Sequence, residues 1–88
     1  MRRYFLSYAN ITKDYYLDYG CFERNRENLG KVNPEKLIES LNDILQLHRK
    51  TIIYVQKSLK ENLKEILDNS FKNTSVNIQF ERNLESLC

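Results

Sequence analysis

Two short segments rich in aromatic residues, close to the start of the chain, constrain the fold more than any other feature. Residues 3–9 (RYFLSYA) and 15–22 (YYLDYGCF) have the composition of β-strands, and the polar connector 10–14 separates them. This arrangement predicts a β-hairpin. Because side chains alternate between the faces of a strand, we expect one face of the hairpin to point toward the helices and the other to be more solvated. The residues of the inner face are Tyr4, Leu6, Tyr8, Tyr15, Leu17 and Tyr19.

A helix is predicted to begin at Asn33-Pro34, because asparagine is a preferred N-cap and proline fits the first helical position. Acidic residues come early in this segment, and Arg49 and Lys50 come late, as the helix dipole favours. We expect the helix to end near residue 49. Its apolar stripe consists of Leu37, Ile38, Leu41, Ile44, Leu45 and His48.

The segment after this helix allows two interpretations. The helical stripe continues in phase, so a β-hairpin followed by one long helix over residues 34–70 is the alternative. Against it, residues 51–55 (TIIYV) are almost entirely β-branched or aromatic, which is typical of a strand. Ser58 and Glu61 also have the spacing of a capping box, which marks the start of a new helix.

We therefore favour a strand at residues 51–56 and a second helix at 59–70. A final half-buried strand is indicated by the alternation of Val76, Ile78 and Phe80 with polar residues. The predicted fold is a single α+β domain spanning residues 1–88, with the element order ββαβαβ.

The small size of the chain limits the function classes that it can serve. A chain of 88 residues buries only about 60–65% of its unfolded surface, so a large enclosed cofactor cavity would be destabilising. Fourteen Lys and Arg against twelve Asp and Glu give a formal charge of +2, short of the excess typical of proteins that wrap nucleic acid. We expect no cofactor, no bound metal and a function carried out by the surface.

The cysteines and the N-terminus favour a cytoplasmic protein. Cys21 and Cys88 are far apart, each without a second cysteine nearby, so neither a redox pair nor a zinc knuckle can be assembled. No run of 18 apolar residues exists, and the chain turns polar at Ser7 before a signal-peptide core can form.

His48 is the single histidine and hence the only candidate for histidine-dependent catalysis. It lies on the apolar stripe of the first predicted helix, where a partly buried or dipole-capping histidine is the simpler interpretation. No acid or second base accompanies it at motif spacing, and with Gly20 and Gly30 as the only glycines a phosphate-cradling loop is hard to build. We do not expect an enzyme.

Basic and aromatic residues are the candidates for partner binding. The stretch between Asp43 and Glu61 contains four Lys or Arg residues and no acid, which favours docking to an acidic protein surface or a phosphate backbone. Arginines in the loop after the hairpin can extend this patch, and tyrosines give large contact area at low entropic cost. The predicted partner-binding residues are Tyr16, Tyr19, Arg24, Arg26, Arg49, Lys50 and Lys57.

The sequence Tyr4-Phe5-Leu6-Ser7-Tyr8 resembles the Y-F-[IL]-S-Y start of very small phage and mobile-element proteins, which continue through a hairpin and a helix into an apolar strand. The corresponding segments here are residues 4–8, 15–22, 37–47 and 51–59. Characterised proteins of this size and origin, anti-CRISPR proteins among them, commonly act as stoichiometric inhibitors of host nucleases or defence complexes. The resemblance implies a function of that kind.

The sequence therefore predicts a protein that binds and inhibits a host or defence protein by covering part of its surface. The alternative is a small nucleic-acid-binding regulator, whose binding would depend steeply on salt. A toxin-type nuclease that uses His48 is less favoured still. A homodimer is compatible with each of these, because an exposed strand edge invites a symmetric partner.

Overall fold

The computed structural model describes residues 2–20, 27–30, 34–45 and 50–84. In chain order the elements are β1 (Arg2–Ala9), β2 (Asp14–Tyr19), β3 (Glu27–Gly30), α1 (Pro34–Ile44), β4 (Thr51–Gln56), the 3₁₀ turn η1 (Lys57–Leu59), α2 (Lys60–Ser70) and β5 (Val76–Glu81). The Cα radius of gyration of 12.0 Å is about the value for a compact folded chain of this length. None of the helices in the described ranges is long and apolar enough to cross a bilayer.

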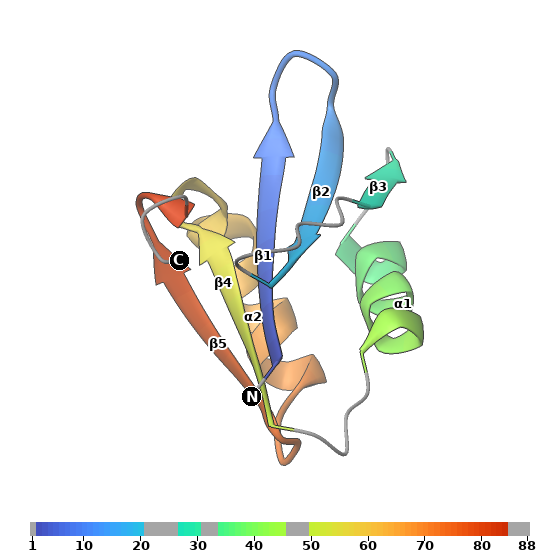
Figure 1. Ribbon diagram of the computed structural model, residues 1–88, viewed down its shortest axis with the longest axis vertical. Helices are drawn as coiled ribbons and strands as arrows, with labels where there is room; N and C mark the ends of the chain where they lie inside the picture. Colours follow the sequence, from blue (N-terminus) through green and yellow to red (C-terminus); the bar gives the residue numbers. More distant parts are fainter. Residues whose placement is uncertain (1, 21–26, 31–33, 46–49, 85–88) are drawn as a thin grey trace.

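The strands form one mixed sheet in the order β3-β2-β1-β4-β5 (Figure 1). β1 pairs antiparallel with β2 and parallel with β4, and β4 pairs parallel with β5. The predicted α+β fold and its ββαβαβ order are confirmed by the four strands β2, β1, β4 and β5 and the two helices. β3 adds a short edge strand, paired antiparallel with β2, within a segment that we expected to be a loop.

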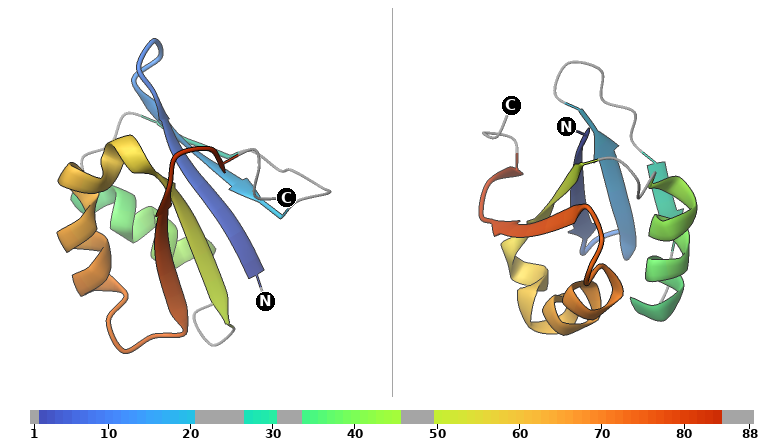
Figure 2. Two further views of the ribbon diagram at one scale, coloured as in Figure 1. Left: turned by 90° about the vertical axis from the view of Figure 1, so that its left-hand side faces the viewer. Right: turned by 90° about the horizontal axis from the view of Figure 1, so that it is seen from below.

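Both helices cover the same face of the sheet (Figure 2). Each helix contributes a row of apolar side chains four residues apart, which is the spacing that keeps a row on one side of a helix. These rows pack against inward-facing residues of β1, β2 and β4 to form the core. The fully or almost fully buried core residues are Tyr4, Leu6, Leu17, Leu37, Leu41, Leu45, Ile53, Val55, Leu59, Leu63, Leu67 and Phe71.

The β1–β2 hairpin has the register that the alternation of tyrosine and leucine predicts. The inner-face cross-strand pairs are Tyr4 with Tyr19, Leu6 with Leu17 and Tyr8 with Tyr15. The two tyrosine pairs are in ring contact, with centroids 5.1 Å and 5.0 Å apart. Aromatic cross-strand contacts of this kind stabilise a hairpin beyond its main-chain bonds.

The long-helix alternative is excluded by the position of β4 inside the sheet. Thr51–Gln56 pairs with β1 on one side and β5 on the other. Its β-branched residues, which are less favourable in a helix, therefore lie in a buried strand. Ile53 and Val55 are fully buried there. Tertiary pairing therefore overrides the helical stripe that runs through this segment.

Two details of the sequence interpretation are wrong. α1 ends at Ile44 rather than near residue 49. The capping box does not form: the Ser58 hydroxyl accepts a bond from the Gln56 side chain at 2.8 Å, and the chain enters α2 through η1 without a side-chain cap. The face turned away from the helices is the more solvated one, as expected, although Phe5 and Ile52 are buried on it and Phe5 stacks on Tyr54 at 5.4 Å.

A matched pair of substitutions tests the placement of the core. Ile53 in β4 is fully buried, whereas Ile11 in the hairpin loop is 98% exposed. We expect Ile53→Val to lower the free energy of unfolding by about 0.5–1.5 kcal/mol, because it removes a buried methylene and leaves a void. Ile11→Val removes the same methylene from solvent-exposed surface and should have no measurable effect. Urea unfolding followed by circular dichroism measures both; equal losses would contradict this core.

Candidate functional site

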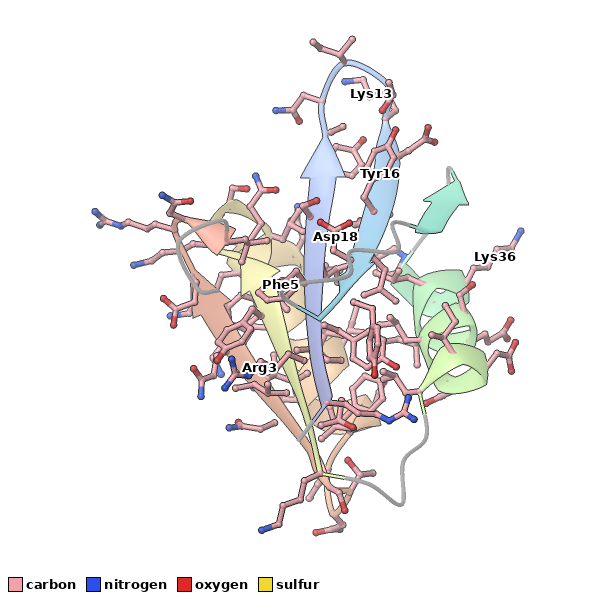
Figure 3. All side chains as sticks on the ribbon, in the orientation of Figure 1. Arg3, Phe5, Lys13, Tyr16, Asp18 and Lys36 are labelled. Carbon is pink, nitrogen blue, oxygen red and sulfur yellow. The ribbon has the colours of Figure 1, made fainter. Side chains whose placement is uncertain are left out.

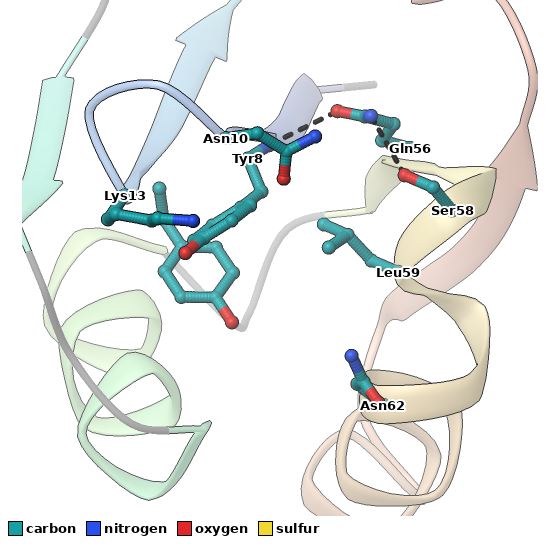
Figure 4. A pocket seen from close by; sticks show the side chains of 8 residues that line it. Tyr8, Asn10, Lys13, Gln56, Ser58, Leu59 and Asn62 are labelled. Carbon is teal, nitrogen blue, oxygen red and sulfur yellow. Dashed lines mark hydrogen bonds between the residues drawn. The ribbon is translucent and has the colours of Figure 1, made fainter.

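A recess of about 580 Å³ lies beyond the carboxyl ends of β1 and β4 (Figure 4). The hairpin forms one of its walls and the start of α2 forms the other, while the end of β4 closes the space between them. The recess is open to solvent on one side. It is lined by Tyr8, Asn10, Lys13, Tyr15, Gln56, Ser58, Leu59 and Asn62.

The side chain of Gln56 holds the two walls together. Its carbonyl oxygen accepts a hydrogen bond from the main-chain N–H of Tyr8 at 3.1 Å, and its amide donates to the Ser58 hydroxyl at 2.8 Å. The parallel β1–β4 ladder ends at the pair Leu6 with Val55, so Gln56 satisfies a β1 donor that lies beyond the ladder. This link connects the hairpin to η1, the turn that leads into α2.

Tyr8 and Tyr15 form the inner wall of the recess as a cross-strand pair. Their rings are tilted by 59° to one another, and both residues are half-buried. Burial raises the pKa of the Tyr15 hydroxyl above its usual value of 10.0, and the neighbouring Tyr8 hydroxyl raises this pKa further. The phenol of Tyr15 therefore remains a protonated hydrogen-bond donor throughout the neutral range.

Among the described residues that line the recess, Lys13 is the one with a charged side chain. It has a positive φ of 60°, in the left-handed region that costs a non-glycine residue about 1 kcal/mol or more. Its main-chain N–H closes the loop by donating to the carbonyl of Ala9 at 2.8 Å. Within the part of the chain that the structure describes, the Lys13 ammonium is in no ion pair, and no carboxylate lines the recess.

The hairpin extends beyond the rest of the sheet. β1 pairs with β4 only as far as Leu6, whereas its pairing with β2 continues to Ala9 opposite Asp14. Figure 1 shows the resulting overhang, with the loop between the strands at its tip. Ile11 lies in that loop and is 98% exposed, the most exposed large apolar side chain among the described residues.

The predicted aromatic site residues lie on opposite faces of β2. Tyr16 is on the face turned away from the helices (Figure 3), where its hydroxyl is 3.3 Å from the Thr12 hydroxyl of the loop. Tyr19 is on the helix-side face at the other end of the strand, 37% exposed, with the Arg2 guanidinium 5.9 Å from its ring centre. They do not form one contact surface.

The predicted basic residues are also separated. Lys50 precedes β4 and Lys57 follows it, so the two exposed side chains lie about 20 Å apart at opposite ends of this strand. A helical stripe of lysines running through both positions is therefore not formed. Arg24, Arg26 and Arg49 lie outside the described residues, as do His48 and both cysteines.

Several residues of the recess and the exposure of Ile11 do not follow from the sequence patterns. Asn10, Ile11 and Lys13 fall in a segment predicted only as a polar connector, although an isoleucine between Asn10 and Thr12 in a hairpin turn is itself unusual for a solvated loop. Gln56 gives no signal in the sequence, because the main-chain N–H that it binds belongs to Tyr8, 48 positions away.

The recess offers many hydrogen-bonding groups to a ligand. Among the described residues its lining consists of phenols, amides, a hydroxyl, an ammonium group and the aliphatic side chain of Leu59. Among the described residues, no three His, Cys, Asp or Glu side chains are close enough together to hold a metal ion. The sequence matches no protein-family model, and neither a curated protein nor a solved structure is significantly similar to it. The function is therefore inferred from this geometry.

The raised pKa of Tyr15 has a testable consequence for stability at alkaline pH. Above pH 10 the unfolded chain loses the Tyr15 proton before the folded chain does, so the free energy of unfolding falls as pH rises. We expect Tyr15→Phe to remove this part of the alkaline loss. Urea unfolding at several values between about pH 8 and 11.5 measures it, and parallel stability curves for both proteins would contradict a raised pKa at Tyr15.

Proposed function

We propose that this protein binds a host or defence-system protein and inhibits it by covering part of its surface, with the β1–β2 hairpin as the principal contact. The proposal rests on one observation above all: a large aliphatic side chain, Ile11, is 98% exposed at the tip of a hairpin that extends past the sheet. Isolated apolar residues on a protein surface are common, but one displayed on a projecting two-stranded support is well placed to enter a pocket.

The hairpin is a rigid support for such a contact. Two tyrosine pairs and the Leu6–Leu17 pair lock its inner face, and the bond from Tyr8 N–H to Gln56 anchors it to the body of the domain. A preorganised loop loses little conformational entropy when it binds. Burying an isoleucine side chain contributes about 1.5–3 kcal/mol, enough for Ile11 to dominate a small interface.

Two further features support the proposal that this protein inhibits a partner protein by binding to it stoichiometrically. The chain resembles small phage and mobile-element proteins over roughly residues 3–60, and characterised proteins of that size and origin commonly inhibit host nucleases or defence complexes in this way. Polar groups surround Ile11, with Asn10 and Lys13 in the same loop and Tyr16 below it, which is the arrangement of an apolar anchor within a polar rim.

Substitution of the hairpin tip tests this proposal. The tagged protein is used to capture partners from bacteria that carry candidate defence systems, and affinity for the purified partner is then measured by calorimetry. We expect Ile11→Asp to weaken binding about 10- to 100-fold, because a carboxylate cannot replace a buried aliphatic group. Ile11→Val is the matched control and should bind nearly as well as the original protein.

Inhibition in cells provides the functional readout. The original protein and Ile11→Val should restore phage or plasmid survival in cells that carry the captured defence system, whereas Ile11→Asp should not. If Ile11→Asp is folded and inhibits as strongly as the original protein, the hairpin tip is not the contact.

The rate of association with the partner should respond differently to charge changes at the two ends of β4. Lys57 lies at the hairpin end of the strand and Lys50 at the far end, and both side chains are exposed. If an acidic partner docks at the hairpin, Lys57→Glu should slow association several-fold at low salt, because local charge governs the encounter. Lys50→Glu makes the same charge change far from the contact and should have a smaller effect. Stopped-flow kinetics at two salt concentrations measures both; equal slowing would place the contact elsewhere.

A further inference from the structure

The recess has an excess of hydrogen-bond donors. The phenols of Tyr8 and Tyr15 and the Lys13 ammonium all line it. Ser58 accepts its bond from Gln56 through the hydroxyl oxygen, which leaves the hydroxyl proton to donate elsewhere. The side-chain amides of Asn10 and Asn62, on opposite walls, add further donors. A ligand with several acceptor atoms can therefore form hydrogen bonds with this lining.

The charge of the lining favours an anion. Of the lining residues that the structure describes, Lys13 alone is charged, and none is an Asp or a Glu. At these residues a cation would meet one like charge, whereas an oxyanion would meet an ammonium group and neutral donors. Charge-assisted hydrogen bonds to an oxyanion are shorter and stronger than neutral ones.

The size and position of the recess suit a small molecule. Its volume of about 580 Å³ falls within the range of roughly 300–1,000 Å³ typical of ligand pockets, which leaves room for an organic group beside the anion. The recess lies at the carboxyl ends of two adjacent parallel strands, between the hairpin into which β1 continues and the η1–α2 segment that follows β4.

We propose that this recess binds a small phosphate-bearing molecule of nucleotide size, with Lys13 and the hydroxyl groups of Tyr15 and Ser58 around the phosphate. A phosphate is favoured over a carboxylate because it offers three oxygens to donors that come from both walls of the recess. Tyr8 and Leu59 supply the less polar surface for the rest of the molecule. The proposal does not depend on the protein partner at the hairpin tip, since Ile11 does not line the recess.

The conformation of Lys13 supports a binding role for this side chain. A glycine or asparagine would occupy a φ of 60° at lower cost, yet a lysine stands there, at the point of the loop from which its ammonium reaches the recess (Figure 4). Strained positions persist where the side chain contributes something other than stability.

Nuclear magnetic resonance titration of the ¹⁵N-labelled full chain tests the proposal. The probes are AMP, ribose 5-phosphate and inorganic phosphate, with adenosine and glutamate as comparison molecules that lack the phosphate. We expect saturable shifts with AMP and ribose 5-phosphate at the amides of Lys13, Tyr15, Ser58 and Asn62. Adenosine and glutamate should give much smaller changes at the same concentrations.

Two variants locate the site. Lys13→Asn keeps a residue that tolerates positive φ and removes the charge, so it should fold and weaken AMP binding by roughly tenfold. Lys72→Asn makes the same change at an exposed position outside the recess and should bind as the original protein does. Tyr15→Phe should weaken AMP binding less than Lys13→Asn does, because it removes one neutral donor.

The outcomes separate this proposal from its competitors. It is overturned if none of the phosphate probes shifts the recess amides, if Lys13→Asn and Lys72→Asn behave alike, or if glutamate binds as tightly as AMP. Ile11→Asp should bind AMP normally. A variant that binds AMP normally and has lost the protein partner is therefore defective in the hairpin contact alone. A variant that binds the partner normally and has lost AMP is defective in the recess alone.

Discussion

The parallel pairing of β1 with β4 is the interaction on which the rest of the structure depends. It joins the N-terminal hairpin to the βαβ unit formed by β4, α2 and β5, and it places Leu6 beside Ile53 and Val55 at the centre of the core. Because the two strands run in the same direction, both of their carboxyl ends reach the same edge of the sheet. The overhang of the hairpin, the Gln56 link and the recess all follow from where this ladder stops.

Sequence patterns predicted the parts of the fold that depend on local periodicity. Alternating Tyr and Leu residues defined the hairpin faces, and the β-branched run in residues 51–55 identified β4 against a competing helical stripe. Contacts between residues that are far apart in the sequence could not be predicted in this way. The Ser58 hydroxyl bonds to the Gln56 side chain instead of capping α2, and Gln56 is at the same time bonded to the main-chain N–H of Tyr8. No periodicity in either segment predicts this contact. The same holds for β3, whose pairing with β2 depends on the path of the chain rather than on its composition.

The candidate site was less predictable than the fold for a related reason. Charge and aromatic content identified residue types suited to binding, but the strands distribute Tyr16 and Tyr19 to opposite faces and Lys50 and Lys57 to opposite ends. The hairpin instead combines two different surfaces in a short segment. Its tip displays an aliphatic side chain, and its inner wall displays hydroxyl and ammonium groups toward α2. A protein contact centred on Ile11 and a small-molecule site lined by Tyr8 and Tyr15 can thus be near neighbours on one support.

The register of β1 against β4 also determines what happens while the chain is being synthesised. Arg2 pairs with Thr51 and Leu6 with Val55, so paired residues of the two strands are 49 positions apart in the chain. At a translation rate of roughly 5–20 residues per second, the hairpin is synthesised several seconds before the strand that completes its core. During that interval neither β4 nor α2 is available to cover its leucine and tyrosine side chains, so the burial of the first strands depends on segments made last.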